Sequence, residues 1–166
     1  MGFRSSGLED LVSTRVSTID GVSVVPLTRI VDERGAIMHM LRSDSPGFVG
    51  FGEVYFSTVH PGVVKGWHIH REMVLNYTVV SGHIKLVLFD DRESSPTHGA
   101  LDEIFMGDHA YVRVTVPAGV WNGFKGVGTT DAIVANCASI PHDPDEISRM
   151  DPFDNHIPYD WALRNR

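Results

Sequence analysis

The chain has 166 residues, which predicts one domain, and a chain of this length buries roughly 70% of the surface that its unfolded form exposes. Its 14 Lys and Arg residues against 21 Asp and Glu residues give a net charge of −7, which argues against a nucleic-acid-binding protein because such proteins need cationic contacts to phosphate. A hydrophobic fraction of 42% and a charged fraction of 21% are typical of a folded globule and exclude a disordered acidic tail.

Residues 1–25 carry charged side chains throughout and therefore contain no apolar signal-peptide core. No stretch of the sequence approaches the ~18 apolar residues that a membrane span needs. The single cysteine, Cys137, allows neither an internal disulfide nor a cysteine-based zinc cluster. We therefore expect a cytoplasmic protein that does not contact a membrane.

Residues 1–20 have mixed polarity and are expected to form an N-terminal arm, with a short helix around residues 8–12, ahead of a single domain over residues 21–166. From residue 22 onward, short β-branched and aromatic runs are separated by glycine and proline turns. The clearest expected strands are Val22–Ile30, Ala36–Leu41, Gly52–Val59, Val74–Val80, His83–Phe89, Ala110–Val116 and Asp131–Cys137.

Strands at this spacing predict an antiparallel sandwich or barrel. From Pro141 onward, repeated prolines prevent long regular elements, so the C-terminal segment is expected to wrap the barrel as loop and short helix.

Two histidines, His68 and His70, stand two residues apart within an expected strand. Residues i and i+2 of a strand lie on the same face, so both imidazoles would point into one cavity if that face is the barrel interior. Histidine is the side chain whose ordinary pKa lies nearest neutrality, which favours a general base or acid. Two other interpretations remain open, a metal site and two ordinary polar histidines at the mouth of a barrel.

The glycine spacing around these histidines resembles the first signature of the cupin barrels, and Gly107 with residues 117–122 resembles the second. A metal-binding cupin carries two further ligands, a glutamate and a histidine, whose positions here are Leu75 and Asn122. At most two of the four metal ligands then remain. Because transition-metal sites usually have three or four protein ligands, we expect no metal and no cofactor.

A longer series of motifs resembles the dTDP-4-dehydrorhamnose 3,5-epimerase family, a branch of the cupins. The resemblance runs from residue 32 to residue 161 and includes Lys65-Gly66-Trp67-His68 in place of the family's R-G-L-H. Its other carriers are Asp32–Gly35, Gly52–Ser57, Val79–Gly82, Ser95–Thr97, Pro117–Phe124 and the Asp151-Pro152 pair.

The resemblance implies that His68 is the catalytic base and that Asp151 supports it by fixing its tautomer. The base would remove the weakly acidic proton beside the 4-keto group of a nucleotide-linked sugar. Arg34 and Lys65 stand where the family contacts the nucleotide, and Glu53 and Ser57 are further substrate-binding candidates from the matching block.

Three functional positions of the family do not match. The tyrosine that protonates the opposite face of the sugar falls near Ala135, the lysine that steadies the enolate oxygen falls near Leu75, and a histidine is replaced by Asn122. Tyr77 or Tyr55 is a candidate to replace the acid, and Asn122 is a candidate donor to the enolate oxygen. Core packing is an equally open role for either tyrosine.

The run from Glu53 to His70 also resembles the sugar 3,4-ketoisomerases, in which a tyrosine-bearing strand precedes R-G-x-H-A-H. That reaction moves a proton along one side of the ring, so it needs two neighbouring bases and no acid on the far face. His68 and His70 suit this demand, whereas the terminal block, residues 145–161, follows the epimerase pattern.

The expected fold is an all-β antiparallel jelly-roll (cupin) barrel with short helical or loop segments at both ends, paired as a homodimer in the manner of the family. The expected function is an isomerase or epimerase acting on a nucleotide-linked 4-keto-6-deoxy sugar, a dTDP-sugar first of all, in polysaccharide biosynthesis. The alternatives are a 3,4-ketoisomerase using His68 and His70, a different cupin enzyme, and a barrel that binds a sugar nucleotide without converting it.

Overall fold

The computed structural model describes residues 16–163, so the helix expected around residues 8–12 lies outside the described residues. The described part of the chain contains strands and loops and no helix, and thus no helix long and apolar enough to cross a membrane. The strands are β1 (Ser23–Pro26), β2 (Arg29–Asp32), β3 (Gly35–Met38), β4 (Glu53–Val59), β5 (Val64–His70), β6 (Leu75–Ser81), β7 (His83–Asp90), β8 (Leu101–Gly107), β9 (Val112–Val116), β10 (Val120–Gly126), β11 (Ala132–Ala138) and β12 (Ile147–Arg149).

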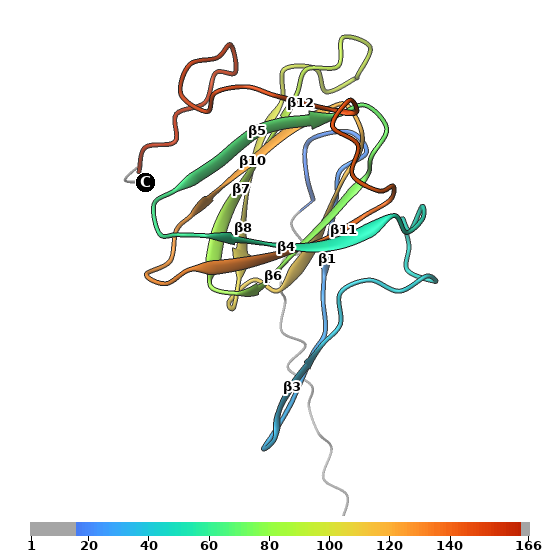
Figure 1. Ribbon diagram of the computed structural model, residues 1–166, viewed down its shortest axis with the longest axis vertical. Coiled ribbons are helices and arrows are strands. Elements are labelled where there is room, and N and C mark those ends of the chain that lie inside the picture. The colour runs from blue at the N-terminus through green and yellow to red at the C-terminus, as the bar shows by residue number, and fades with distance from the viewer. Residues whose placement is uncertain (1–15, 164–166) are drawn as a thin grey trace, which may run out of the picture.

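Ten of these strands form two five-stranded sheets that face each other as a barrel (Figure 1). One sheet has the order β1-β9-β6-β11-β4 and the other the order β12-β5-β10-β7-β8, with antiparallel pairing between the neighbouring strands. The non-sequential order is that of a jelly roll. The predicted all-β antiparallel barrel is confirmed.

The expected strand over residues 22–30 is divided in two. β1 pairs with β9 as far as Pro26, and the chain then leaves the barrel to form the two-stranded β2–β3 hairpin. This hairpin projects away from the barrel (Figure 1) and leaves the apolar side chains of Ile30, Val31 and Ile37 more than half exposed.

The C-terminal segment contains a strand where the sequence led us to expect a short helix. β12 pairs with β5, with Ile147 opposite His70 and Arg149 opposite His68. Three residues are enough for this strand because the backbones of Met150 and Trp67 also exchange two hydrogen bonds of 3.0 Å. The late part of the chain therefore lies beside the strand that carries both histidines.

The two faces of β5 pack against different surroundings. Because strand side chains alternate, His68 and His70 face the inside of the barrel while Trp67 and Ile69 face outward. Residues 150–161 cover the outer face, where the rings of Trp67 and Trp161 lie 5.1 Å apart and both are almost fully buried. This second, aromatic core holds β5 from behind.

Two facing glycines make room for this aromatic core. A Cβ atom built on Gly123 would lie 3.3 Å from the ring of Trp161 and 3.0 Å from the Cα atom of Gly66 on the neighbouring strand. Larger residues at these two positions would push the tryptophan away from the sheet. The glycines thus explain how residues 150–161 approach β5 so closely.

We predict that Trp161→Ala destabilises the protein, because it leaves a large cavity against Trp67 and loosens the packing behind β5. The expected loss in the free energy of unfolding is about 3 kcal/mol or more, measured by denaturant unfolding. Phe153→Ala is the control, since Phe153 is 76% exposed and its loss should change stability by less than about 0.5 kcal/mol. Equal stability of the Trp161 variant and the control would contradict this packing.

Candidate active site

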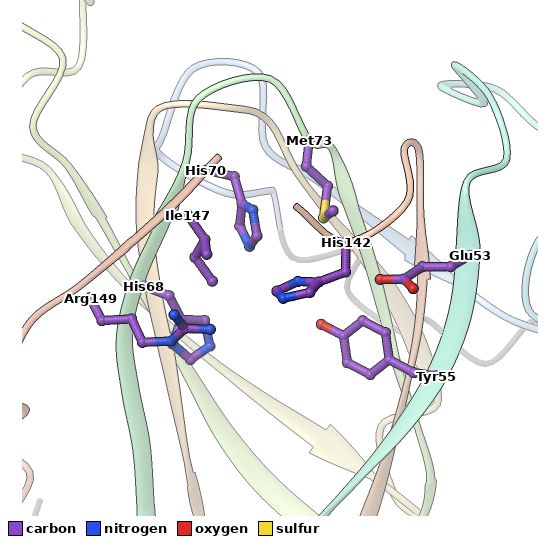
Figure 2. A pocket seen from close by; sticks show the side chains of 8 residues that line it. All are labelled: Glu53, Tyr55, His68, His70, Met73, His142, Ile147 and Arg149. Atoms are coloured by element: carbon purple, nitrogen blue, oxygen red, sulfur yellow. The ribbon is translucent and has the colours of Figure 1, made fainter. Parts of the chain in front are cut away.

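A cavity of about 400 Å³ opens at the end of the barrel where β5, β12 and β4 meet. A volume of this size is within the range of small-molecule sites. Figure 2 shows the side chains that surround the cavity, which are Glu53, Tyr55, His68, His70, Met73, His142, Ile147 and Arg149. Two opposite walls can be distinguished, one carrying His68, His70 and Arg149 and the other carrying Glu53, Tyr55 and His142.

His70 is held by a buried carboxylate. Its Nδ1 atom lies 2.5 Å from Oε2 of Glu146, and both side chains are about 95% buried. The other carboxylate oxygen accepts hydrogen bonds from the backbone amides of Glu72, at 2.7 Å, and Met73, at 2.8 Å. Burial works to raise the pKa of Glu146, but the two amides and His70 together hold that pKa below its ordinary value.

An ionised Glu146 fixes the tautomer of His70. Nδ1 must carry the proton that it donates to the carboxylate, so the lone pair stays on Nε2. The ring of His70 is directed into the cavity (Figure 2), where it is one of the lining groups. The pair is therefore arranged as a carboxylate-supported general base.

His68 has a different environment. Burial first of all, then the neighbouring ring of His70 and the cations Arg149 and Lys65, lowers the pKa of His68 from 6.5 to about 4, so its ring is neutral at neutral pH. Its backbone carbonyl accepts a hydrogen bond from the amide of Asn122, while its ring makes no hydrogen bond within residues 16–163. A neutral imidazole with a free edge is able to accept or donate one hydrogen bond to a ligand.

Asp151 does not reach His68. Strand β12 ends at Arg149, and the chain then turns, so that the carboxylate of Asp151 accepts hydrogen bonds from the amides of Phe153 and Asp154. The expected pairing of His68 with Asp151 is thus absent from the structure, which instead joins His70 to Glu146.

The two candidate tyrosines lie in different environments, one in the main core and the other at the cavity. Tyr77 is buried in the main core and donates a hydrogen bond of 3.1 Å to Asn122, and burial holds its pKa well above 10. Asn122 is itself fully buried, and its amide group bonds to the carbonyls of His68 and Val120. Tyr55 lines the cavity, with its hydroxyl accepting a hydrogen bond of 3.0 Å from Asn136.

The four expected substrate-binding residues lie in different places. Glu53 lines the cavity, and Ser57, which shares the strand face of Glu53 and Tyr55, accepts a hydrogen bond of 3.1 Å from the ammonium group of Lys65. Arg34 lies on the projecting hairpin, where it is 85% exposed and paired with Asp32. The structure therefore does not bring Arg34 to this cavity.

Three polar residues of the site escaped the sequence reasoning, namely His142, Glu146 and Arg149. They belong to a proline-containing segment with one short strand, which shows no periodicity that would place their side chains. Within residues 16–163, no three His, Cys, Asp or Glu side chains are grouped in a way that would hold a metal ion.

The sequence pattern of the dTDP-4-dehydrorhamnose 3,5-epimerase family matches residues 16–166. A probable low-salt glycan biosynthesis epimerase of Haloferax volcanii is 36% identical over 144 residues, which are 86% of this chain and 89% of the relative. A spore coat polysaccharide biosynthesis protein of Bacillus subtilis is 32% identical over 142 residues, 86% of this chain and 91% of the relative.

Among solved structures, a dTDP sugar isomerase from Desulfovibrio desulfuricans superposes with a TM-score of 0.83 at 42% identity and covers 89% of this chain and 94% of that one. An epimerase of Mycobacterium tuberculosis superposes with a TM-score of 0.80 at 26% identity and covers 90% of this chain and 78% of that one. The matched pattern takes in both walls of the cavity and the C-terminal segment that completes it. The chain belongs to the dTDP-4-dehydrorhamnose 3,5-epimerase family and is an enzyme of the sugar-isomerase class.

Proposed function

We propose that this enzyme epimerises a nucleotide-linked 4-keto-6-deoxy sugar and that His70, supported by Glu146, removes the proton beside the 4-keto group. The proposal depends on one observation, the 2.5 Å contact between His70 Nδ1 and Glu146 Oε2 in the wall of the cavity. Such a carboxylate orients the imidazole and stabilises the imidazolium that forms when the base takes a proton.

The family resemblance implied His68 as this base, and His68 remains a group of the same wall. A pKa of about 4 makes His68 a weak base at neutral pH, because general-base efficiency is highest when the pKa lies near the working pH. His70 has the carboxylate partner that His68 lacks. These differences support a transfer of the base role by two residues along β5.

The substrate class follows from the family and from the cavity. The matched family and the Desulfovibrio isomerase are both named for dTDP-sugars. The cavity is large enough for a sugar ring, and the cation of Lys65 is near enough to His68, a lining residue, to contribute to its lowered pKa. A cation there suits the diphosphate of a nucleotide sugar.

Epimerisation also needs an acid on the wall opposite the base. Tyr55 supplies a hydroxyl on that wall, oriented by its bond from Asn136, and we assign it this role. Because His68 and His70 share one wall, 3,4-ketoisomerisation by the two histidines is the second candidate function.

We also infer that the enzyme works as a homodimer. Its outer surface carries exposed apolar side chains on β4, where Val54 is 52% and Phe56 is 65% exposed, and on the projecting hairpin. Large apolar side chains exposed in groups often mark an interaction site. A second copy of the chain is the partner we infer, because most soluble oligomers are symmetric assemblies of one chain and the twofold dimer is the commonest of them.

We predict that His70→Ala and Glu146→Gln each lower the rate of solvent-deuterium incorporation into dTDP-4-keto-6-deoxyglucose by about 100-fold or more. The first change removes the base and the second removes the charge that fixes its tautomer. Mass spectrometry and NMR of the sugar measure the incorporation. Glu93→Gln, in an exposed turn, is the matched control and should exchange at the wild-type rate. Wild-type exchange by the His70 variant would overturn the assignment of the base.

We predict that Tyr55→Phe separates the two candidate reactions. An epimerase without its acid still takes and returns the proton on one face, so deuterium should enter the sugar while the inverted product falls by about 100-fold. A ketoisomerase should form its 3-keto product undiminished. Tyr111→Phe is the control, because its hydroxyl bonds to the His39 carbonyl outside the cavity.

We predict that His68 makes the free energy of unfolding depend on pH. Its folded-state pKa of about 4 lies below the ordinary 6.5, so the unfolded chain binds a proton that the folded chain does not. Stability is therefore complete above pH 6.5 and falls as the pH drops toward 4. The expected loss between pH 7 and 4.5 is about 2 kcal/mol.

His68→Gln should remove this part of the slope, as measured by denaturant unfolding at several pH values. His98→Gln is the control, because His98 lies exposed in a turn. A slope that survives unchanged in the His68 variant would show that His68 titrates normally.

A further inference from the structure

Arg149 is the cation that faces the two histidines. It closes β12 and pairs in register with His68 across the β5–β12 interface. Figure 2 shows its side chain in the cavity on the wall of His68. Its positive charge is near enough to contribute to the lowered pKa of His68.

The guanidinium group of Arg149 makes no ion pair or hydrogen bond to another described residue. Each of the other arginines in residues 16–163 has a protein partner, either a carboxylate, as for Arg29, Arg34, Arg42 and Arg92, or a backbone carbonyl, as for Arg71 and Arg113. An arginine that lines a cavity without a partner has all five of its N–H donors available to a ligand. The ligand that it suits best is an anionic oxygen.

Proton abstraction beside a ketone creates such an oxygen. When His70 Nε2 takes the proton, the C–H electron pair becomes the C=C bond and the C=O π pair moves onto oxygen, which leaves an enolate. The position that carries a lysine in the family is Leu75 here, which is 1% exposed in the main core. Lys65 is bonded to Ser57. Among the described residues that line the cavity, Arg149 is the one with a permanently charged cationic side chain.

We propose that Arg149 is a catalytic residue that stabilises the enolate oxygen at C4, beside the ring of His68. The proposal rests on the function proposed above. Reprotonation of the carbon reverses the electron flow, so the step needs no oxidant, reductant or co-reactant.

The chemistry of the sugar distinguishes this role from phosphate binding. C3 and C5, the carbons whose protons are acidic, both flank C4, whereas the diphosphate is attached at C1 on the far side of the ring. A cation that contacts the C4 oxygen is therefore remote from the diphosphate, so the two roles predict different effects when the cation is removed. Lys65 remains the cation for the nucleotide.

Arg149→Met, which removes the charge and keeps much of the side-chain volume, is expected to lower kcat for deuterium exchange by about 100-fold. KM and the Kd of dTDP, the latter measured by calorimetry, should change less than about twofold, because the interaction forms only as charge develops on the oxygen. Arg149→Ala should regain part of its activity when guanidinium chloride is added at concentrations that leave the wild-type rate unchanged. Arg42→Met is the control of equal charge, since Arg42 pairs with Asp44 away from the cavity.

Exchange at the wild-type rate by Arg149→Met would overturn the proposal while leaving the function of the enzyme intact. If Arg149→Met loses affinity for dTDP but keeps its kcat, the proposal is also overturned, because Arg149 would then bind the phosphates. Failure of the wild-type enzyme to exchange at all would instead overturn the proposed function, and this inference with it. Melting temperatures of the variants test whether they are folded. Arg149→Lys provides a second variant, and its exchange rate should lie between the rates of the wild type and of Arg149→Met.

Discussion

The buried carboxylate of Glu146 is the interaction on which the site depends. It accepts hydrogen bonds from His70 and from two backbone amides between β5 and β6, so it joins the C-terminal segment to the barrel. A buried charge is tolerated only where hydrogen bonds compensate its desolvation, and here three donors do so. The carboxylate that orients the base thereby also holds the beginning of β12, which positions Arg149 opposite His68.

The outer face of β5 supports the same arrangement from behind. Trp67 packs against Trp161 on this outer face. Its backbone also forms two hydrogen bonds with the backbone of Met150. The alternation of the strand thus gives a rigid apolar surface outside and a polar cavity inside. Catalytic side chains need to be held within narrow limits, and strands fixed on both faces provide this better than loops do.

Much of the fold and half of the site could be predicted from the sequence. Short β-branched and aromatic runs, separated at regular spacing by glycine and proline turns, predicted the barrel, and the spacing of His68 and His70 predicted a shared wall. The Glu146 partner could not be found, because the two residues of the pair are 76 positions apart and β12 has only three residues, too few for a periodic signal. Tyr77 and Tyr55 belong to the same sheet, but Tyr77 packs in the main core with its hydroxyl bonded to Asn122, whereas Tyr55 lines the cavity.

The departures from the family pattern become consistent once the electrostatics of the cavity are considered together. By the family resemblance, the lysine position falls at the buried Leu75. Within residues 16–163, no carboxylate is bonded to His68, whereas His70 has one, and the guanidinium of Arg149 in the cavity has no protein partner. Base and counter-charge are thus both supplied from the β5–β12 pair. Moving either group alone would separate the developing imidazolium from its carboxylate or the enolate from its cation, and the proposed reaction needs both pairs. The two replacements therefore make sense as one coupled change.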